Sequence, residues 1–332
     1  MRSRRFIGAA AAASASAVAA LLLAQGAGAA TKNYAAGVLI IDTNLAYQNA
    51  AAAGTGMALT ANGIVLTNNH VIKGATTIKV VDPSTHRTYT ATVLGYDVAD
   101  DIALLKLQGA SNLKTVKLGD SSKARTGEAV TAIGNAGGTG RLTTATGRIV
   151  ALRQTITASD EQGSSEQLTG LIETNAGIEP GDSGGPLMDS STGKVLGMDT
   201  AASSNLVARR ASQAYAIPIN KALTIVKQIE SGSSTVAHIG PTAFLGVGVE
   251  DPGQGVSGAL IANLVSGGPA DQAGLVEGDV ITALDGNTVD SATTLGSVMQ
   301  HEAPGKSVEV DYLDQFGTPQ TTTVTLGTGP PQ

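Results

Sequence analysis

The sequence predicts a mainly β protein in which two six-stranded barrels are followed by a smaller α+β domain. Glycine is frequent, at 42 of 332 residues, aromatic residues make up only 3%, and short apolar runs alternate with turn residues. Many short strands joined by tight turns produce such a composition, whereas long helices do not. The length suits two or three compact modules, each with its own core.

Residues 1–29 have the pattern of a secretory signal peptide. A basic start with three arginines precedes an uncharged, alanine-rich run at 9–23, and Ala27-Gly28-Ala29 supplies a cleavage site. The alternative is an uncleaved membrane anchor, but the run is shorter than the ~20 residues that a span needs. The pair Arg4-Arg5 also suits twin-arginine export. We expect a secreted or extracytoplasmic protein, membrane-bound only if the signal is uncleaved.

Charge and cysteine content exclude two classes of protein. Removal of residues 1–29 takes away three arginines and no acids, so the formal charge moves from -6 to -9. An acidic chain is a poor partner for nucleic acid. The chain has no cysteine, so this exported protein is expected to be stabilised by packing without disulfides.

Six apolar runs predict the strands of the first barrel, because strands at this spacing form small closed barrels. Turns at 61–63 and 82–84 separate some of them. We expect 45–53 to be a short loop between the first strands and 108–126 to be a connector. The predicted strands are 38–41, 56–60, 64–68, 77–81, 88–96 and 102–107.

Six further runs predict the second barrel, with a polar loop at 159–167. A helix is expected to follow, with Asn220 as its N-cap and an apolar face that closes the module. The predicted strands are 129–133, 143–151, 168–174, 186–188, 194–200 and 214–218. The apolar face of the helix consists of Ala222, Leu223, Ile225, Val226 and Ile229.

The rest of the chain is predicted to form a linker followed by one small domain. Residues 231–234 are glycine and serine, which is typical of a flexible linker. Residues 244–326 have their own strand and turn pattern and a helix at 291–300. We therefore expect a signal peptide at 1–29, a first domain at 30–230, a linker at 231–240 and a last domain at 241–329.

The candidate nucleophile is Ser183, which lies in a glycine-rich turn between two predicted strands. Glycines let the backbone turn sharply, so that successive N–H groups can point to one spot. The amides of Gly181 and Ser183 are therefore candidates for an oxyanion hole. The alternative is an ordinary glycine-rich turn.

Among four histidines, His70 is the candidate base for Ser183. It ends a strand-like run, whereas His86, His238 and His301 lie in a turn, a linker and a helix end. The imidazole needs an acid to hold its tautomer. Asp101 directly precedes an apolar strand and is best placed for burial.

Two other interpretations fit these residues less well. Asp97, Asp100 and Asp101 could form a cation site, but Ca²⁺ needs six to eight oxygens and no further ligand pattern is present, so Asp97 and Asp100 are expected to be loop carboxylates. The G-x-S-x-G elbow of α/β-hydrolases needs a helix after the serine and a later histidine, and here a predicted strand follows.

Together these motifs resemble HtrA/DegP-type trypsin-like serine proteases. They are Thr-Asn-Asn-His-Val-Ile at 67–72, Asp-Ile-Ala-Leu at 101–104 and Gly-Asp-Ser-Gly-Gly-Pro at 181–186, with further matches at 132–135 and 215–218. Residues 244–247, 269–275 and 278–281 resemble a PDZ domain, and 238–246 is similar to the secreted actinobacterial PepA proteases. The resemblance covers residues 37–326. It implies a trypsin-like double six-stranded β-barrel with the site in the cleft, a C-terminal PDZ domain, and extracytoplasmic proteolysis in protein quality control.

This sequence departs from the family pattern at two places. The short loop at 45–53 replaces the long regulatory loop of the large DegP assemblies, so a cage is not expected, although a trimer is compatible with the family. Asp182 precedes the nucleophile where many bacterial relatives have asparagine. No metal or cofactor is implied.

The resemblance locates two peptide-binding regions. A tryptic enzyme has a carboxylate six residues before the serine, where this chain has Gly177, followed by Ile178; with Thr200, Ala201 and Ala202 these form the expected specificity pocket, which predicts cleavage after small or medium apolar residues. Substrate would add as a strand beside 200–202, which favours unfolded chains. The expected residues at the PDZ groove for peptide ends are Phe244, Leu245, Gly246, Val247, Leu295 and Met299. Of the apolar helix residues Leu295, Val298 and Met299, at least one is expected to belong to the ordinary core.

The sequence thus predicts a secreted serine endopeptidase that acts through an acyl-enzyme. A peptide-binding or chaperone-like protein with a poorly assembled triad is the alternative. Cleavage of casein distinguishes the two.

Overall fold

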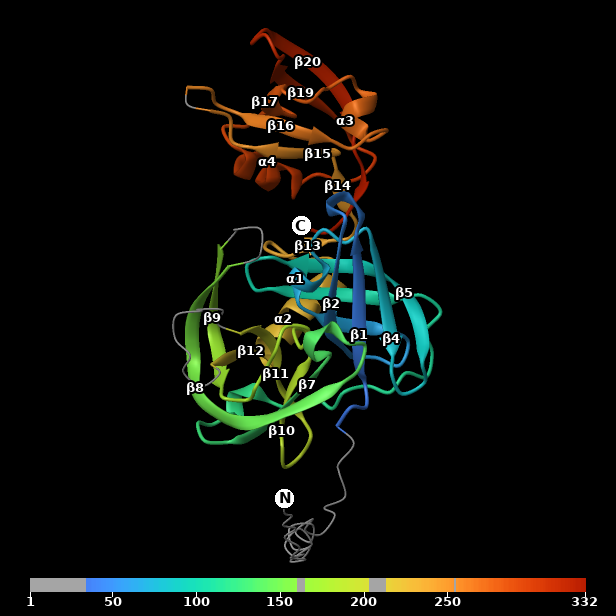
Figure 1. The fold of residues 1–332 in the computed structure, drawn as a ribbon, viewed down its shortest axis with the longest axis vertical. Helices are drawn as coiled ribbons and strands as arrows, with labels where there is room; N and C mark the ends of the chain where they lie inside the picture. The colour runs from blue at the N-terminus through green and yellow to red at the C-terminus, as the bar shows by residue number, and fades with distance from the viewer. Residues whose placement is uncertain (1–33, 160–164, 203–212, 254) are drawn as a thin grey trace, which may run out of the picture. The chain divides into compact units, whose positions relative to one another are not determined.

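A computed structural model describes residues 34–159, 165–202, 213–253 and 255–332 (Figure 1). The predicted signal peptide at 1–29 and residues 160–164 of the predicted loop lie outside these ranges. Within them, no helix has the length and apolar character needed to cross a membrane.

The first barrel is a closed antiparallel ring, as predicted. Its strands are β1 (Val38–Leu45), β2 (Ala50–Ala58), β3 (Ile64–Thr67), β4 (Thr77–Asp82), β5 (Arg87–Asp97) and β6 (Ile102–Leu107). They follow one another around the ring in the order β5-β4-β1-β2-β3-β6, and pairing of β5 with β6 closes it. The four-residue helix α1 (Asn69–Ile72) comes directly after β3.

The predicted loop at 45–53 is wrong in most of its length. Strands β1 and β2 continue as a hairpin until Leu45 pairs with Ala50, and the turn contains the 3-10 helix η1 (Ala46–Gln48). The alanines at the start of β2 are exposed, so this part of the strand lacks the apolar signal by which strands are recognised.

The second barrel is also closed. Its strands are β7 (Ala129–Gly134), β8 (Thr143–Ser159), β9 (Ser165–Thr174), β10 (Pro186–Asp189), β11 (Val195–Ala202) and β12 (Ala214–Pro218). Their order around the barrel is β10-β11-β12-β9-β8-β7. The predicted loop at 159–167 is too long, because β8 and β9 stay paired as far as Ser159 and Ser165. These strand ends are polar and give no apolar run.

Helix α2 (Ile219–Glu230) closes the second barrel, but Asn220 is not its N-cap. The N-cap position is Pro218, which has no capping side chain, and Asn220 lies inside the first turn. Its Nδ2 donates to Asp120 Oδ1 at 2.8 Å instead. Helix α2 packs against β11 and β12 and also against β5 and β6 of the first barrel. Of its predicted apolar face, four residues are buried in the core and Leu223 is partly buried.

Part of the predicted linker is a strand. β13 (His238–Ile239) pairs with β5 of the first barrel. After it come β14 (Thr242–Phe244), β15 (Val247–Glu250), β16 (Ala259–Leu264), α3 (Pro269–Gln272), β17 (Val280–Leu284), β18 (Asn287–Thr288), α4 (Ala292–Met299), β19 (Ser307–Leu313), β20 (Pro319–Thr325) and β21 (Gly327–Gly329).

The last domain has an antiparallel sheet ordered β15-β16-β17-β19-β20, with β18 on β17, and β14 pairs separately with β21. Figure 1 shows α4 next to β15. The predicted helix at 291–300 is confirmed, and Ser291 caps it by accepting the Thr294 N–H at 3.2 Å. Leu295 and Met299 of α4 are buried in the core of this domain.

Candidate active site

The loop that carries Ser183 connects β9 to β10 and is fixed to the first barrel. Thr55 of β2 donates its N–H to Ser183 O at 2.9 Å and its hydroxyl to Gly181 O at 2.7 Å. The Thr67 hydroxyl in turn donates to Thr55 O at 2.7 Å. Strands of one barrel therefore position the loop of the other.

Two glycines of this loop are required by its geometry. Gly181 and Gly184 have φ of 97° and 85°, which L side chains rarely adopt. A Cβ on Gly181 would lie 2.3 Å from Asn135 O, and one on Gly184 would lie 2.1 Å from Thr55 O. Any larger residue would displace the backbone beside Ser183.

The peptide between Pro180 and Gly181 is oriented by the 3-10 helix η3 (Ala136–Gly138). Gly137 donates its N–H to Pro180 O at 2.7 Å. In a trans peptide the C=O and the N–H point in opposite directions, so the Gly181 N–H points away from η3. Among the described residues, neither Gly181 nor Ser183 donates its amide to an acceptor. Both N–H groups are thus available to a ligand.

His70 and Asp101 are in direct contact. His70 Nδ1 lies 2.9 Å from Asp101 Oδ2 and 3.1 Å from Oδ1, and the His70 backbone N–H donates to Oδ1 at 3.0 Å. Asp101 is buried in a left-handed conformation at φ 53°, and Asn68 Nδ2 holds its carbonyl at 2.9 Å. The His70 side chain is 42% exposed. The Nδ1 edge of the imidazole is therefore anchored by Asp101, while the rest of the ring is open to solvent.

Gly54 of β2 shows that the histidine and serine segments meet. A Cβ on Gly54 would lie 2.6 Å from Val71 Cγ1 and 3.3 Å from Ser183 O. Val71 follows His70 on α1, so α1 and the nucleophile loop pack on the same point of β2. The structure brings together three segments that are far apart in the sequence.

Thr200 of β11 binds the same carboxylate. Its hydroxyl donates to Asp101 Oδ2 at 2.7 Å, and the residue is almost fully buried. Thr200 was expected to line the specificity pocket, and sequence reasoning missed its contact with Asp101. It also missed the roles of Thr55, Thr67 and Asn68. No local pattern marks any of these contacts, since each joins residues from segments that are separate in the sequence.

The other residues of the predicted specificity pocket differ in their positions. Gly177 is exposed with open space around its Cα, while the Ile178 side chain is buried in the second barrel. Ala201 and Ala202 end β11, and residues 203–212 beyond them lie outside the described part.

One prediction about the aspartate cluster is wrong. Asp97 ends β5 and is 2% exposed, so it is no loop carboxylate, and burial raises its pKa. Asp100 pairs with Lys221. In the described ranges, no three His, Asp or Glu side chains are arranged to hold a metal ion.

Two of the three remaining histidines, His238 and His301, have contacts elsewhere in the fold. His86 lies exposed in a turn, and His301 Nδ1 lies 2.9 Å from Ser297 O. The His238 ring lies 5.0 Å from the Tyr96 ring, centroid to centroid, and its Nδ1 is 3.2 Å from Gln300 O.

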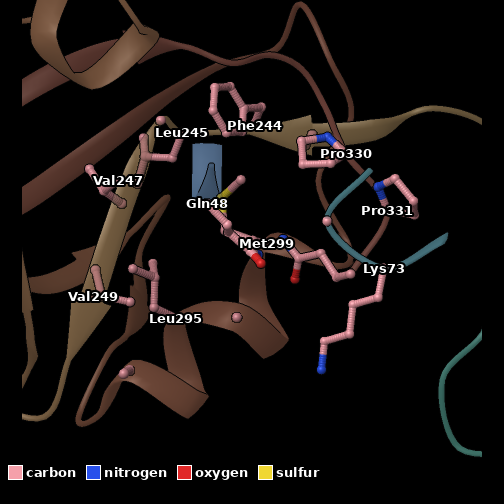
Figure 2. A pocket seen from close by; sticks show the side chains of 16 residues that line it. Gln48, Lys73, Phe244, Leu245, Val247, Val249, Leu295, Met299, Pro330 and Pro331 are labelled. Atoms are coloured by element: carbon pink, nitrogen blue, oxygen red, sulfur yellow. The ribbon is translucent and has the colours of Figure 1, made fainter. Parts of the chain in front are cut away.

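The last domain contains a groove between β15 and α4. Figure 2 shows Leu245, Val247 and Leu295 around a cavity of about 330 Å³, which Phe244, Gly246 and Met299 also line. Leu245, Leu295 and Met299 belong to the core as well, as expected for some of them. Lys73, next to α1, and Pro331 are also among the lining residues, and Gly74 donates its N–H to Pro331 O at 2.8 Å.

Comparison with known families gives two matches. Residues 54–198 match the trypsin-like peptidase domain, and residues 243–326 match the PDZ domain.

Alignments with several serine proteases extend over most of this chain. It is 33% identical to the serine protease PepD of Mycobacterium tuberculosis over 87% of this chain and 63% of that protein. It is 32% identical to the putative serine protease HhoA of Synechocystis over 78% of this chain and 67% of that protein. A probable periplasmic DegP-like endoprotease of Halomonas elongata is 33% identical, with 83% and 56% covered. The chain thus spans between half and two thirds of the length of these relatives.

Solved structures agree with this assignment. The HtrA-type protease AlgW with a tripeptide matches with a TM-score of 0.51 and 28% identity, covering 90% of this chain and 95% of that one. The two barrels, the PDZ domain and the named relatives together show that this chain belongs to the HtrA-type trypsin-like serine proteases.

Proposed function

We propose that the chain is a serine endopeptidase that works through an acyl-enzyme. Ser183 Oγ attacks the substrate carbonyl carbon, and His70 takes the hydroxyl proton and later gives it to the leaving amine. Asp101 keeps the His70 proton on Nδ1, so that Nε2 can act as the base. The carrying observation is the His70–Asp101 contact at 2.9 Å beside a nucleophile loop docked on Thr55.

The amides of Gly181 and Ser183 serve as the oxyanion hole. Both lack acceptors among the described residues, and the Pro180 carbonyl is turned toward Gly137. Donors fixed in this way stabilise the developing negative charge by roughly 3–4 kcal/mol each. The sharp turn at Gly181 supports this role because only glycine fits there.

Cleavage after small or medium apolar residues follows from the pocket residues. The position where a tryptic enzyme has its carboxylate is Gly177, and the next residue is the buried Ile178, so neither position supplies an acid to bind lysine or arginine. Thr200, Ala201 and Ala202, at the end of β11, are the other residues assigned to this pocket. Profiling with a peptide library tests this proposal, and a strong preference for arginine would contradict it.

Unfolded polypeptides are the proposed substrates, because an extended backbone can pair with the end of β11. Strand β10 pairs with β11 as far as Met198, so among the described residues no strand pairs with 200–202 on that side. Main-chain pairing gives affinity without sequence information. Peptide ends would bind between β15 and α4, with the amides at Gly246 receiving the carboxylate.

An extracytoplasmic location is proposed from the signal at 1–29 and from relatives named periplasmic endoproteases. Membrane attachment would require an uncleaved signal. Sequencing the N-terminus of the mature protein decides between the two.

Cleavage of casein by the wild type and by Ser183→Ala tests the activity. Loss of the hydroxyl should lower turnover by about a millionfold, as in subtilisin. Thermal unfolding of both proteins controls for folding. Equal rates would overturn the proposal and leave a peptide-binding or chaperone-like protein.

A further inference from the structure

The hydroxyl of Thr55 links two loops of the second barrel. Thr55 lies on β2 of the first barrel and is fully buried. Its Oγ1 donates to Gly181 O at 2.7 Å in the loop that carries Ser183, and it accepts the Asn135 N–H at 2.9 Å. Asn135 directly follows β7 and leads into η3. One oxygen atom therefore joins the nucleophile loop to the segment that begins η3.

The two partners fix the direction of the Thr55 hydroxyl hydrogen. A hydroxyl has one hydrogen to donate and two lone pairs that accept. The Asn135 N–H can only donate and the Gly181 carbonyl can only accept, so the hydrogen of Thr55 Oγ1 must point to Gly181 O. Loss of this oxygen would leave the buried Asn135 N–H without its acceptor and would release the Gly181 carbonyl.

Two hydrogen bonds hold the peptide planes on either side of Gly181. Gly137 donates to Pro180 O at 2.7 Å, which holds the plane that contains the Gly181 N–H. Thr55 holds the following plane through Gly181 O. The angles φ and ψ of a residue are the rotations between its two planes, and glycine itself restricts them least. With both planes held, Gly181 keeps its φ of 97° and its N–H keeps one direction.

Thr55 also holds Ser183, the other residue of the proposed oxyanion hole. The Thr55 N–H donates to Ser183 O at 2.9 Å. Thr55 is itself restrained in β2, because it faces Ile40 of β1 and its carbonyl accepts the Thr67 hydroxyl at 2.7 Å. One restrained residue thus contacts both residues whose amides are the candidate donors.

The part of the loop after Ser183 is held by the backbone of β11. Gly184 donates its N–H to Asp199 O at 2.8 Å, and Gly185 O accepts the Asp199 N–H at 2.7 Å. These bonds do not reach Gly181. The orientation of the Gly181 carbonyl depends on the Thr55 side chain instead.

We propose that the Thr55 hydroxyl positions the oxyanion hole by holding the Gly181 carbonyl, so that the Gly181 N–H points to the oxygen of the substrate carbonyl. Thr55 is a positioning residue, since it acts through Gly181 and its O–H bond stays intact. This role rests on the proposed function. Negative charge develops on the substrate oxygen only as Ser183 attacks, so a misdirected Gly181 N–H weakens transition-state stabilisation and hardly changes substrate binding.

Thr55→Ala and Thr55→Ser form a matched pair, because both remove the methyl group and only alanine removes the hydroxyl. On one peptide substrate, kcat should be about ten- to hundredfold lower in Thr55→Ala than in Thr55→Ser, with KM values within about twofold. Thr55→Ser should stay within about threefold of the wild type. Thr43→Ala is the control and should keep its kcat, since Thr43 is a buried threonine of β1 whose hydroxyl donates to Ala52 O.

Inhibitor binding separates this positioning role from general support of the fold. A peptide aldehyde forms a tetrahedral adduct with a catalytic serine, whereas the corresponding peptide alcohol binds without one. Thr55→Ala should bind the aldehyde about ten- to hundredfold more weakly than Thr55→Ser does, and the alcohol equally well. Equal weakening of both inhibitors would assign Thr55 to barrel packing and overturn the proposal. Equal kcat values in the two variants would overturn it as well.

Urea unfolding shows whether the variants fold. If Thr55→Ala does not, Thr55→Cys takes its place, because a thiol donates only weakly, and its kcat should lie at least about threefold below that of Thr55→Ser. The proposed function fails separately. Equal cleavage of casein by wild type and Ser183→Ala would remove the reaction itself, whereas an active wild type with equal Thr55→Ala and Thr55→Ser would remove only the role of Thr55.

Discussion

Asp101 and Asp199 are two equally buried aspartates in contact with the same small region of the fold, yet their surroundings differ completely. Asp101 Oδ1 accepts the His70 amide, Oδ2 accepts the Thr200 hydroxyl, and both oxygens lie near His70 Nδ1. Asp199 has no donor to either oxygen in the described part of the chain. Burial alone therefore does not fix the charge of an acid; the donors around it do.

The largest expected difference between the two residues lies in their asparagine variants. Asp101→Asn should lower kcat by about 10⁴, because the amide cannot hold His70 in the tautomer that accepts the Ser183 proton. Asp199→Asn should leave kcat within a few-fold. Steady-state kinetics on one peptide substrate measure both. If Asp101→Asn retained more than about a tenth of wild-type kcat, Asp101 would have no orienting role.

The sequence could predict the parts of this comparison that depend on local pattern. Residues 102–107 and 214–218 were predicted as strands with the observed bounds, because both are short buried apolar runs between polar or turn residues. His70, Asp101 and Ser183 were found because the mechanism needs these residue types and each one adjoins a recognisable run.

The sequence could not predict contacts that depend on how the strands meet. Thr200 precedes two alanines in an apolar strand, and nothing there indicates that its hydroxyl reaches Asp101. Asp199 looks like a polar residue at a strand end, although its exposure is zero. The far end of the β8–β9 hairpin is polar and gives no apolar run, so its length was underestimated. Tertiary pairing decided each of these cases.

The variant Gly184→Ala tests whether the backbone or the side chain of Asp199 is the stronger restraint on the loop that carries Ser183. A methyl group in Gly184→Ala would lie 2.1 Å from Thr55 O at a φ of 85°, so backbone must move. We expect about 2–4 kcal/mol of lost unfolding free energy and at least a hundredfold drop in kcat/KM.

Urea unfolding and peptide kinetics measure the effect of Gly184→Ala. Gly253→Ala is the control, because no atom lies within 4 Å of its Cβ position and its φ is not positive. Similar behaviour of the two variants would mean that the loop tolerates movement at Gly184.

Thr200 should have a smaller effect, because it supports Asp101 through a single hydrogen bond. Thr200→Val removes the donor to Asp101 Oδ2 while keeping the shape, and we expect kcat to fall about five- to tenfold. Thr200→Ser keeps a hydroxyl and should recover most of the activity. Equal loss in both variants would assign the effect to packing and not to the hydrogen bond.

The smallest expected effect on turnover comes with a change in stability. The pH dependence of the unfolding free energy reports on Asp199 directly. Because burial raises its pKa, folded Asp199 binds its proton more tightly than the unfolded chain does. Its contribution to stability is therefore full below the unfolded pKa of about 3.9 and is lost as the pH rises through the folded pKa. Asp199→Asn cannot titrate, so the unfolding free energy of this variant should gain on the wild type as the pH rises, by at most about 1.4 kcal/mol per pH unit.

Asp189 provides the opposite sign for the same measurement. Burial works to raise its pKa, but hydrogen bonds from Thr192 and Ser191 outweigh burial and lower it. Its contribution is present above the unfolded pKa and is lost as the pH falls through the folded value. In a Ser183→Ala background, which prevents self-cleavage, urea unfolding from about pH 4 to about pH 8 should show the Asp199→Asn difference growing with pH and the Asp189→Asn difference changing only on the acid side. A constant difference between Asp199→Asn and its parent would mean that the Asp199 carboxyl is ionised in the folded protein.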